Sequence, residues 1–144
     1  MGFSKNFKIA AAAVVAAGLF SMVSCSNSAK MNESTPSVTH ISENDFTNTV
    51  IASTNPVVVD FYATWCAPCR VLDPMIERVA PSFTNSMKFV KVNADEAPGL
   101  AQKYSVIGFP TLLVFKDGKV VDNEPGLPTE MDLRERLEAL TAIK

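Results

Sequence analysis

Two cysteines, Cys66 and Cys69, are separated by Ala67 and Pro68 in the stretch FYATWCAPCR. A cysteine attacks a disulfide only as its thiolate, so its reactivity depends on a lowered pKa. The pattern after Cys66 predicts a helix, whose first turn favours an anion through its unpaired N–H groups and its dipole. Pro68 suits that turn because its missing N–H costs nothing there. Cys69 would lie one turn on, on the same face. The spacing therefore predicts an exposed attacking thiol, Cys66, and a resolving thiol, Cys69.

Two other roles for this cysteine pair are less favoured. A structural zinc site needs about four ligands, and beyond the pair the predicted domain has no second pair and a single histidine, His40. We therefore expect no metal site and an ordinary strand position for His40. A purely structural disulfide across two intervening residues would close too small a loop to stabilise the fold much.

Asp60 is the second chemical signal. It interrupts the run VVVDFYA six residues before Cys66, where a strand buried on both faces would carry an apolar side chain. A lone buried carboxylate tends to be protonated, which makes it a proton carrier at neutral pH. Because this strand leads directly to the cysteines, we predict that Asp60 lies beneath the sulfurs and helps to deprotonate Cys69. The alternative is an aspartate that only caps the turn.

Three further side chains would tune the site. The alternation along MKFVKVNAD could aim Lys91 at the layer of Asp60, although a solvated strand lysine fits the pattern as well. Trp65 and Ala67 would flank the sulfurs and limit access of water. A tryptophan near a turn can also simply belong to the core.

The sequence Gly108-Phe109-Pro110-Thr111 opens another strand. Proline is accepted at the first position of a strand or at a sheet edge. A cis Phe109–Pro110 bond would leave the backbone of Phe109 exposed beside the cysteines, ready to pair with an extended substrate peptide. Most prolines are trans, so spacing alone leaves this open.

The elements that must position these residues follow in the order β-α-β-α-β-α-β-β-α. Strands are predicted at SVTHI, at VVVDFYA, at MKFVKVNAD and in a hairpin around Asp117-Gly118. Helices are predicted after Ser42, from Cys66, over PGLAQKYSV and from Thr129. This alternation predicts an α/β fold with a central mixed sheet, helices on both faces and a closing antiparallel hairpin.

The N-terminal residues 1–24 have the pattern of a secretory signal. MGFSKNFK carries two lysines and no acid, and the apolar run 9–23 is short for a membrane-spanning helix. MVSC resembles a bacterial lipobox with Met22 in place of the usual Leu. We expect Cys25 to be lipidated as the first residue of the mature protein. Ordinary cleavage nearby and an uncleaved anchor are the alternatives.

Composition and length limit the rest. A chain of 144 residues suits one domain with its own core, and 47% hydrophobic residues indicate a globular protein. The net charge of −2 provides no basic patch, so we expect no nucleic-acid partner. The organisation that follows is a signal at 1–24, a polar flexible tether at 25–37 and one domain at 38–144.

Together these motifs resemble the thioredoxin family. VDFYATWCAPCR, KVNADEAPGLAQKYSVIGFPTLLVFKDGK and PGLP match the order and spacing of that family, without insertion or deletion from Val38 to Lys144. The resemblance implies the thioredoxin fold and a protein-disulfide reductase that works by dithiol–disulfide exchange. It implies a redox-active Cys66–Cys69 disulfide and no other cofactor.

The resemblance also assigns roles to single residues. It implies that Cys66 attacks, that Cys69 resolves, and that Asp60 is a buried proton acceptor with Lys91 as its neighbour. It implies that Pro74 bends the helix of the cysteines. Pro110 would be the cis-proline and Gly126 part of the substrate groove. The residues expected to bind substrate are Phe109, Pro110, Thr111 and Gly126.

Departures from the family pattern modify these expectations. Ala67 replaces the usual Gly between the cysteines, which should leave a reducing character. The absence of a histidine between the cysteines argues against isomerases and strong oxidases. Pro125 replaces a residue that is usually β-branched, which weakens the assignment of Gly126 to the groove.

The predicted signal is the largest departure. It places the protein on the periplasmic side of a bacterial membrane, anchored by lipid, in a compartment where disulfides persist. A reductase there needs disulfide-containing substrate proteins and a membrane thiol protein as electron donor. The alternatives are a net oxidase or isomerase in the same compartment, and a binding module whose thiols are incidental.

Overall fold

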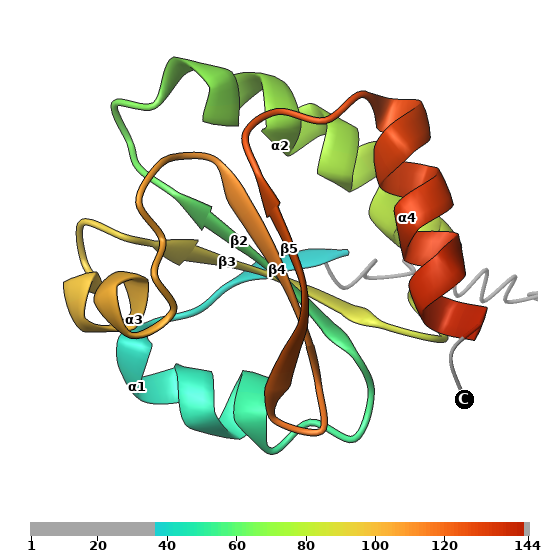
Figure 1. The fold of residues 1–144 in the computed structure, drawn as a ribbon, viewed down its shortest axis with the longest axis horizontal. Helices are drawn as coiled ribbons and strands as arrows, with labels where there is room; N and C mark the ends of the chain where they lie inside the picture. The colour runs from blue at the N-terminus through green and yellow to red at the C-terminus, as the bar shows by residue number, and fades with distance from the viewer. Residues whose placement is uncertain (1–36, 143–144) are drawn as a thin grey trace, which may run out of the picture. The chain divides into compact units, whose positions relative to one another are not determined.

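A five-stranded mixed sheet forms the centre of the computed structural model, which describes residues 37–142 (Figure 1). The strand order is β1-β3-β2-β4-β5. β1, β3 and β2 are parallel to one another, whereas β4 is antiparallel to β2 and to β5. The strands are β1 (Val38–His40), β2 (Val57–Tyr62), β3 (Lys88–Asn93), β4 (Thr111–Lys116) and β5 (Lys119–Pro125). The predicted mixed sheet with a closing hairpin is confirmed.

Helices cover both faces of this sheet, as predicted. Figure 1 shows α2 and α4 on one face and α1 and α3 on the other. The α-helices are α1 (Glu43–Phe46), α2 (Ala67–Val79), α3 (Pro98–Lys103) and α4 (Glu130–Ala142). The chain continues α1 as a π-helical turn over Thr47–Ile51 and follows α2 with a 3₁₀ turn over Ala80–Ser82.

Local sequence explains where most of these elements begin. The Ser42 hydroxyl accepts a hydrogen bond from the backbone N–H of Asp45 and caps α1. Thr129 does the same for Asp132 at the start of α4, with an N···O distance of 3.1 Å. The hairpin turn between β4 and β5 is completed by Gly118, whose φ of +73° is readily adopted by glycine.

The central strand β2 divides the core in two. Its alternate side chains point to opposite faces of the sheet. Val58 packs in the cluster formed with α2 and α4, whereas Val57, Val59 and Phe61 pack in the cluster formed with α1 and α3. Asp60 follows Val58 by two residues and therefore faces α2.

The sheet register places a second charged residue next to Asp60. Lys91 on β3 is the direct partner of Asp60 across the parallel β2–β3 ladder. Cross-strand partners share a face of the sheet, so both side chains point towards α2. The fold thus brings a carboxylate and an ammonium together under the helix that carries the cysteines.

Within residues 37–142, none of the helices is both long and apolar enough to cross a membrane. The predicted signal over 1–24 and the expected lipidation site Cys25 lie outside the described residues. So does the predicted tether, apart from residue 37.

Candidate active site

The cysteine pair lies at the start of α2 and forms a disulfide. The S–S distance is 2.08 Å and the Cα–Cα distance is 5.4 Å. Cys66 is the N-cap of the helix, and the backbone N–H of Cys69 donates a hydrogen bond to Cys66 Sγ at 3.1 Å. In the reduced protein the same N–H would favour a thiolate at Cys66, because the first turn of a helix leaves its donors unpaired.

The prediction of an exposed attacking thiol is wrong for the disulfide form. Cys66 is 3% exposed, and it packs with Ala63 and Cys69 against the side chains of Tyr62 and Phe109. A thiol that reduces this disulfide must therefore reach sulfurs packed in an apolar cluster.

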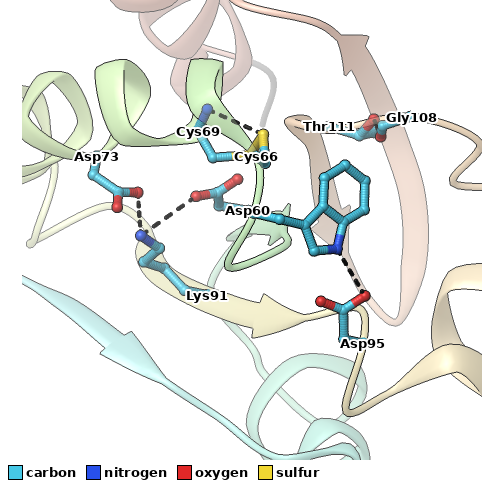
Figure 2. The surroundings of a disulfide bond; sticks show 9 residues. Asp60, Cys66, Cys69, Asp73, Lys91, Asp95, Gly108 and Thr111 are labelled. Atoms are coloured by element: carbon cyan, nitrogen blue, oxygen red, sulfur yellow. Dashed lines mark hydrogen bonds and ion pairs between the residues drawn. A yellow bond between two sulfur atoms is a disulfide. The ribbon is translucent and has the colours of Figure 1, made fainter.

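Trp65 forms the rim of this site. It is 67% exposed, so the alternative of a core tryptophan is wrong. Its indole N–H donates to Asp95 at 3.4 Å, and its ring meets Phe109 edge to face at a centroid distance of 5.7 Å. The dashed line that ends at Asp95 in Figure 2 marks this hydrogen bond. Ala67, also predicted to flank the sulfurs, is exposed in the first turn of α2.

Asp60 is buried under the cysteines without a hydrogen bond. It is 1% exposed, and neither of its side-chain oxygens has a hydrogen-bond partner among the described residues. The alternative that Asp60 caps the turn is therefore wrong. Burial raises the pKa of Asp60 from 3.8 to about 7, against the attraction of Lys91 and with a smaller contribution from the charge of Asp73.

Lys91 is buried as well. Its side chain is 8% exposed, and its Nζ lies 3.8 Å from Oδ2 of Asp60 (Figure 2). The same ammonium donates to Oδ1 of Asp73 on α2 and lies 4.7 Å from the ring centroid of Tyr62. The alternative of a solvated strand lysine is therefore wrong.

Asp73 and Asp95 are the residues of this site that the sequence analysis missed. Asp73 follows Cys69 by four residues, so the helical period places both on one face of α2. That spacing was a usable signal, but it becomes informative only once Lys91 is known to lie under the same face. Asp95 had no comparable signal, because its contact with Trp65 joins two loops.

Among the predicted substrate-binding residues, Phe109 contacts the cysteines and Gly126 is bonded to Pro110. The Phe109–Pro110 peptide bond is cis, as the family resemblance implied, and Phe109 packs against the cysteine cluster. The N–H of Gly126 donates to the carbonyl oxygen of Pro110 at 2.8 Å, and Gly126 has a φ of +91°. Thr111 is buried, and its hydroxyl donates to the carbonyl oxygen of Gly108 at 2.8 Å.

The remaining polar groups near this site include no cluster that would hold a metal. No group of three or more histidine, cysteine, aspartate or glutamate side chains converges within residues 37–142. His40 lies on β1, where its Nδ1 is 3.3 Å from the hydroxyl of Tyr62 and its ring meets the Tyr62 ring edge to face.

Comparison with known proteins gives one consistent result. The family model for thioredoxin matches residues 37–139. Thioredoxin 1 of Synechococcus elongatus is 39% identical over 98 residues, which cover 68% of this chain and 92% of that protein. Thioredoxin of Porphyra purpurea is 38% identical over 101 residues, which cover 70% of this chain and 94% of that protein. The M-type chloroplastic thioredoxin of Chlamydomonas reinhardtii is 42% identical over 79 residues, which cover 55% of this chain and 56% of that protein.

The raised pKa of Asp60 predicts a pH-dependent stability of the disulfide form. Between the unfolded pKa of 3.8 and the folded value of about 7, the folded protein binds the proton more tightly, so stability falls as pH rises through this window. Above it the ionised carboxylate costs ~4 kcal/mol, at about 1.4 kcal/mol per pKa unit. The free energies of unfolding of wild type and Asp60→Asn should be measured with denaturant at pH 4 and at pH 8. Between these pH values the wild type should lose ~4 kcal/mol of stability relative to the variant. Parallel curves would contradict the assignment.

Proposed function

The chain belongs to the thioredoxin family, and from this premise we propose that it is an exported protein-disulfide reductase in which Cys66 attacks, Cys69 resolves and Asp60 accepts the proton. Its activity is thiol–disulfide exchange through the Cys66–Cys69 pair, by which thioredoxins reduce disulfides in substrate proteins. The observation that carries the proposed roles is the placement of this pair at the start of α2, over a buried carboxylate with no hydrogen bond.

The reaction starts from the dithiol form. The thiolate of Cys66 attacks one sulfur of the substrate disulfide, a bond forms between Cys66 and that sulfur, and the other substrate sulfur leaves as a thiolate. Cys69 then loses its proton and attacks Sγ of Cys66. The Cys66–Cys69 disulfide forms, the second substrate sulfur leaves, and two electrons have passed to the substrate.

Asp60 is suited to take the proton of Cys69 in the second step. A general base works best when its pKa lies near the working pH. At a pKa of about 7, a large fraction of Asp60 is ionised at neutral pH and able to accept the proton. An ordinary surface aspartate would be ionised too, but with a pKa near 3.9 it would be a much weaker base.

Substrate would bind along the surface formed by Trp65, Ile107, Phe109 and the Gly126 loop. Trp65 and Ile107 are large apolar side chains that are 67% and 100% exposed. The hydrogen bond from Gly126 to Pro110 joins the two loops that border the disulfide. An extended segment around a substrate cysteine would bury part of this apolar surface and pair with the backbone beside Pro110.

We infer that net electron flow runs towards the substrate. Ala67 and Pro68 add neither a charge nor a side-chain hydrogen-bond donor between the cysteines, so nothing there stabilises the dithiol form as a histidine would. An oxidase or isomerase is the second candidate, because the proposed compartment is oxidising.

Substitution of the cysteines separates the catalytic steps. In an insulin-reduction assay with dithiothreitol, Cys66→Ser should be no faster than dithiothreitol alone, because residue 66 can no longer attack as a thiolate. Cys69→Ser should instead accumulate a covalent complex with substrate, visible on non-reducing gels. A Cys66→Ser protein with full reductase activity would contradict the mechanism, whereas a variant that loses this activity but keeps its biological role would favour a binding module.

Export and anchoring are proposed from the N-terminal sequence. The family model begins at residue 37, so the charged, apolar and small-residue regions of 1–24 precede the matched domain. Lipid attached at Cys25 would hold the domain near a membrane surface through the polar stretch that follows. A reductase so placed needs electrons from a membrane thiol protein.

Changing Cys25 tests the anchor directly. In a bacterial host that processes lipoproteins, the wild-type protein should sediment with membranes, and its mature N-terminal peptide should carry the mass of a lipidated cysteine. Cys25→Ala should lose both properties, whereas Ser26→Ala, a small change next to it, should keep them. An unmodified Cys25 in a soluble wild-type protein would overturn this proposal.

The redox state inside cells tests the direction of electron flow. After acid quench and thiol alkylation, we expect most of the Cys66–Cys69 pair to be reduced, because a donor would recharge it after each turnover. Cells treated with dithiothreitol or diamide provide the two reference states. A pair found mostly oxidised would favour the oxidase alternative.

A further inference from the structure

Lys91 lies between two carboxylates that differ in exposure. Asp60 is buried on β2, whereas the side chain of Asp73 on α2 is 40% exposed. Figure 2 shows the ammonium group of Lys91 with one carboxylate on each side of it. The three groups therefore form a series of charge contacts from the interior beneath the cysteines to the surface of α2.

The interactions of Lys91 with the two carboxylates differ. It donates a hydrogen bond to Oδ1 of Asp73, but its Nζ is 3.8 Å from Oδ2 of Asp60, which has no hydrogen-bond partner. We propose that Asp73 is a positioning residue that binds the ammonium of Lys91 and keeps it from hydrogen-bonding to Asp60, so that the buried carboxylate has only the longer ion pair and can take up a proton. This inference rests on the acceptor role proposed for Asp60.

The physical reason is competition for one cation. A hydrogen-bonded ion pair with Lys91 would favour the ionised form of Asp60 and lower its pKa, typically by 1–3 units for a close opposite charge. Asp60 would then remain ionised at neutral pH and would be a weaker base. Asp73 prevents this because its exposed carboxylate can approach the ammonium without losing all of its hydration.

Other charged or titratable groups surround the three residues. The ring of Tyr62 lies next to the ammonium of Lys91, and the pKa of its hydroxyl is raised by partial burial and by the charges of Glu96, Asp73 and Asp60. Glu96, after β3, accepts a hydrogen bond from Asn93 at 2.8 Å. His40 on β1 contacts the Tyr62 hydroxyl, and the two cysteines lie above Asp60. Within residues 37–142, Asp73 is the one carboxylate that hydrogen-bonds to Lys91.

The first test compares two charge-removing substitutions on one helix. Asp73→Asn releases Lys91 towards Asp60, and we expect the pKa of Asp60, followed by carboxyl ¹³C NMR in the disulfide form, to fall by roughly one unit. Glu77→Gln removes the same charge from an exposed position of α2 that makes no ion pair among the described residues. It should leave the pKa of Asp60 unchanged. An Asp60 pKa that stays or rises in Asp73→Asn overturns the proposal.

The second test asks whether Asp73 acts through Lys91. In a Lys91→Met background, which keeps the length of the side chain but removes its charge, Asp73→Asn should shift the pKa of Asp60 by less than half as much as in the wild type. An equal shift in both backgrounds would mean a direct charge effect and would overturn a positioning role. These measurements read Asp60 itself. Failure of its acceptor role would show separately, as an Asp60→Asn variant that reduces insulin at the wild-type rate.

Discussion

Burial of the Asp60 carboxylate is the constraint around which the active site is organised. Its position on the central strand, with neighbouring strands on both sides and α2 above, removes water from the carboxyl group. Desolvation is the largest contribution to its pKa and outweighs the attraction of Lys91. The protein therefore keeps, in its core, a group that is unfavourable for stability once ionised but well matched to proton transfer at neutral pH.

The cysteines depend on a different feature of the same helix. Cys66 caps α2, so an N–H of the first turn points at its sulfur and would favour a thiolate there once the disulfide is reduced. Asp60 lies below, in an environment that disfavours charge. The sulfur of Cys66 and the carboxyl group of Asp60 thus have opposite electrostatic surroundings, although only one loop separates β2 from α2.

Further contacts surround the disulfide and the Asp60 carboxylate. Phe109 packs against the cysteines and meets the ring of Trp65, and the next residue, Pro110, accepts a hydrogen bond from Gly126. Lys91, shared between Asp60 and Asp73, links the interior of the site to the exposed face of α2. Under the proposed roles of Asp60 and Asp73, a charge at the surface of α2 would influence the chemistry at the sulfurs without contacting substrate.

The amino-acid sequence was enough to predict the order of the strands and helices, the Cys66–Cys69 pair and a functional role for Asp60. Each depends on local pattern: hydrophobic periodicity, capping residues, or a charge inside an apolar run. Other properties became known only from the packed structure. Asp60 lacks a hydrogen bond, Lys91 is buried and Trp65 is exposed. Asp73 binds the ammonium group of Lys91. These properties depend on strand register and on the packing of α2 over the sheet, which bring together residues that are distant in the chain.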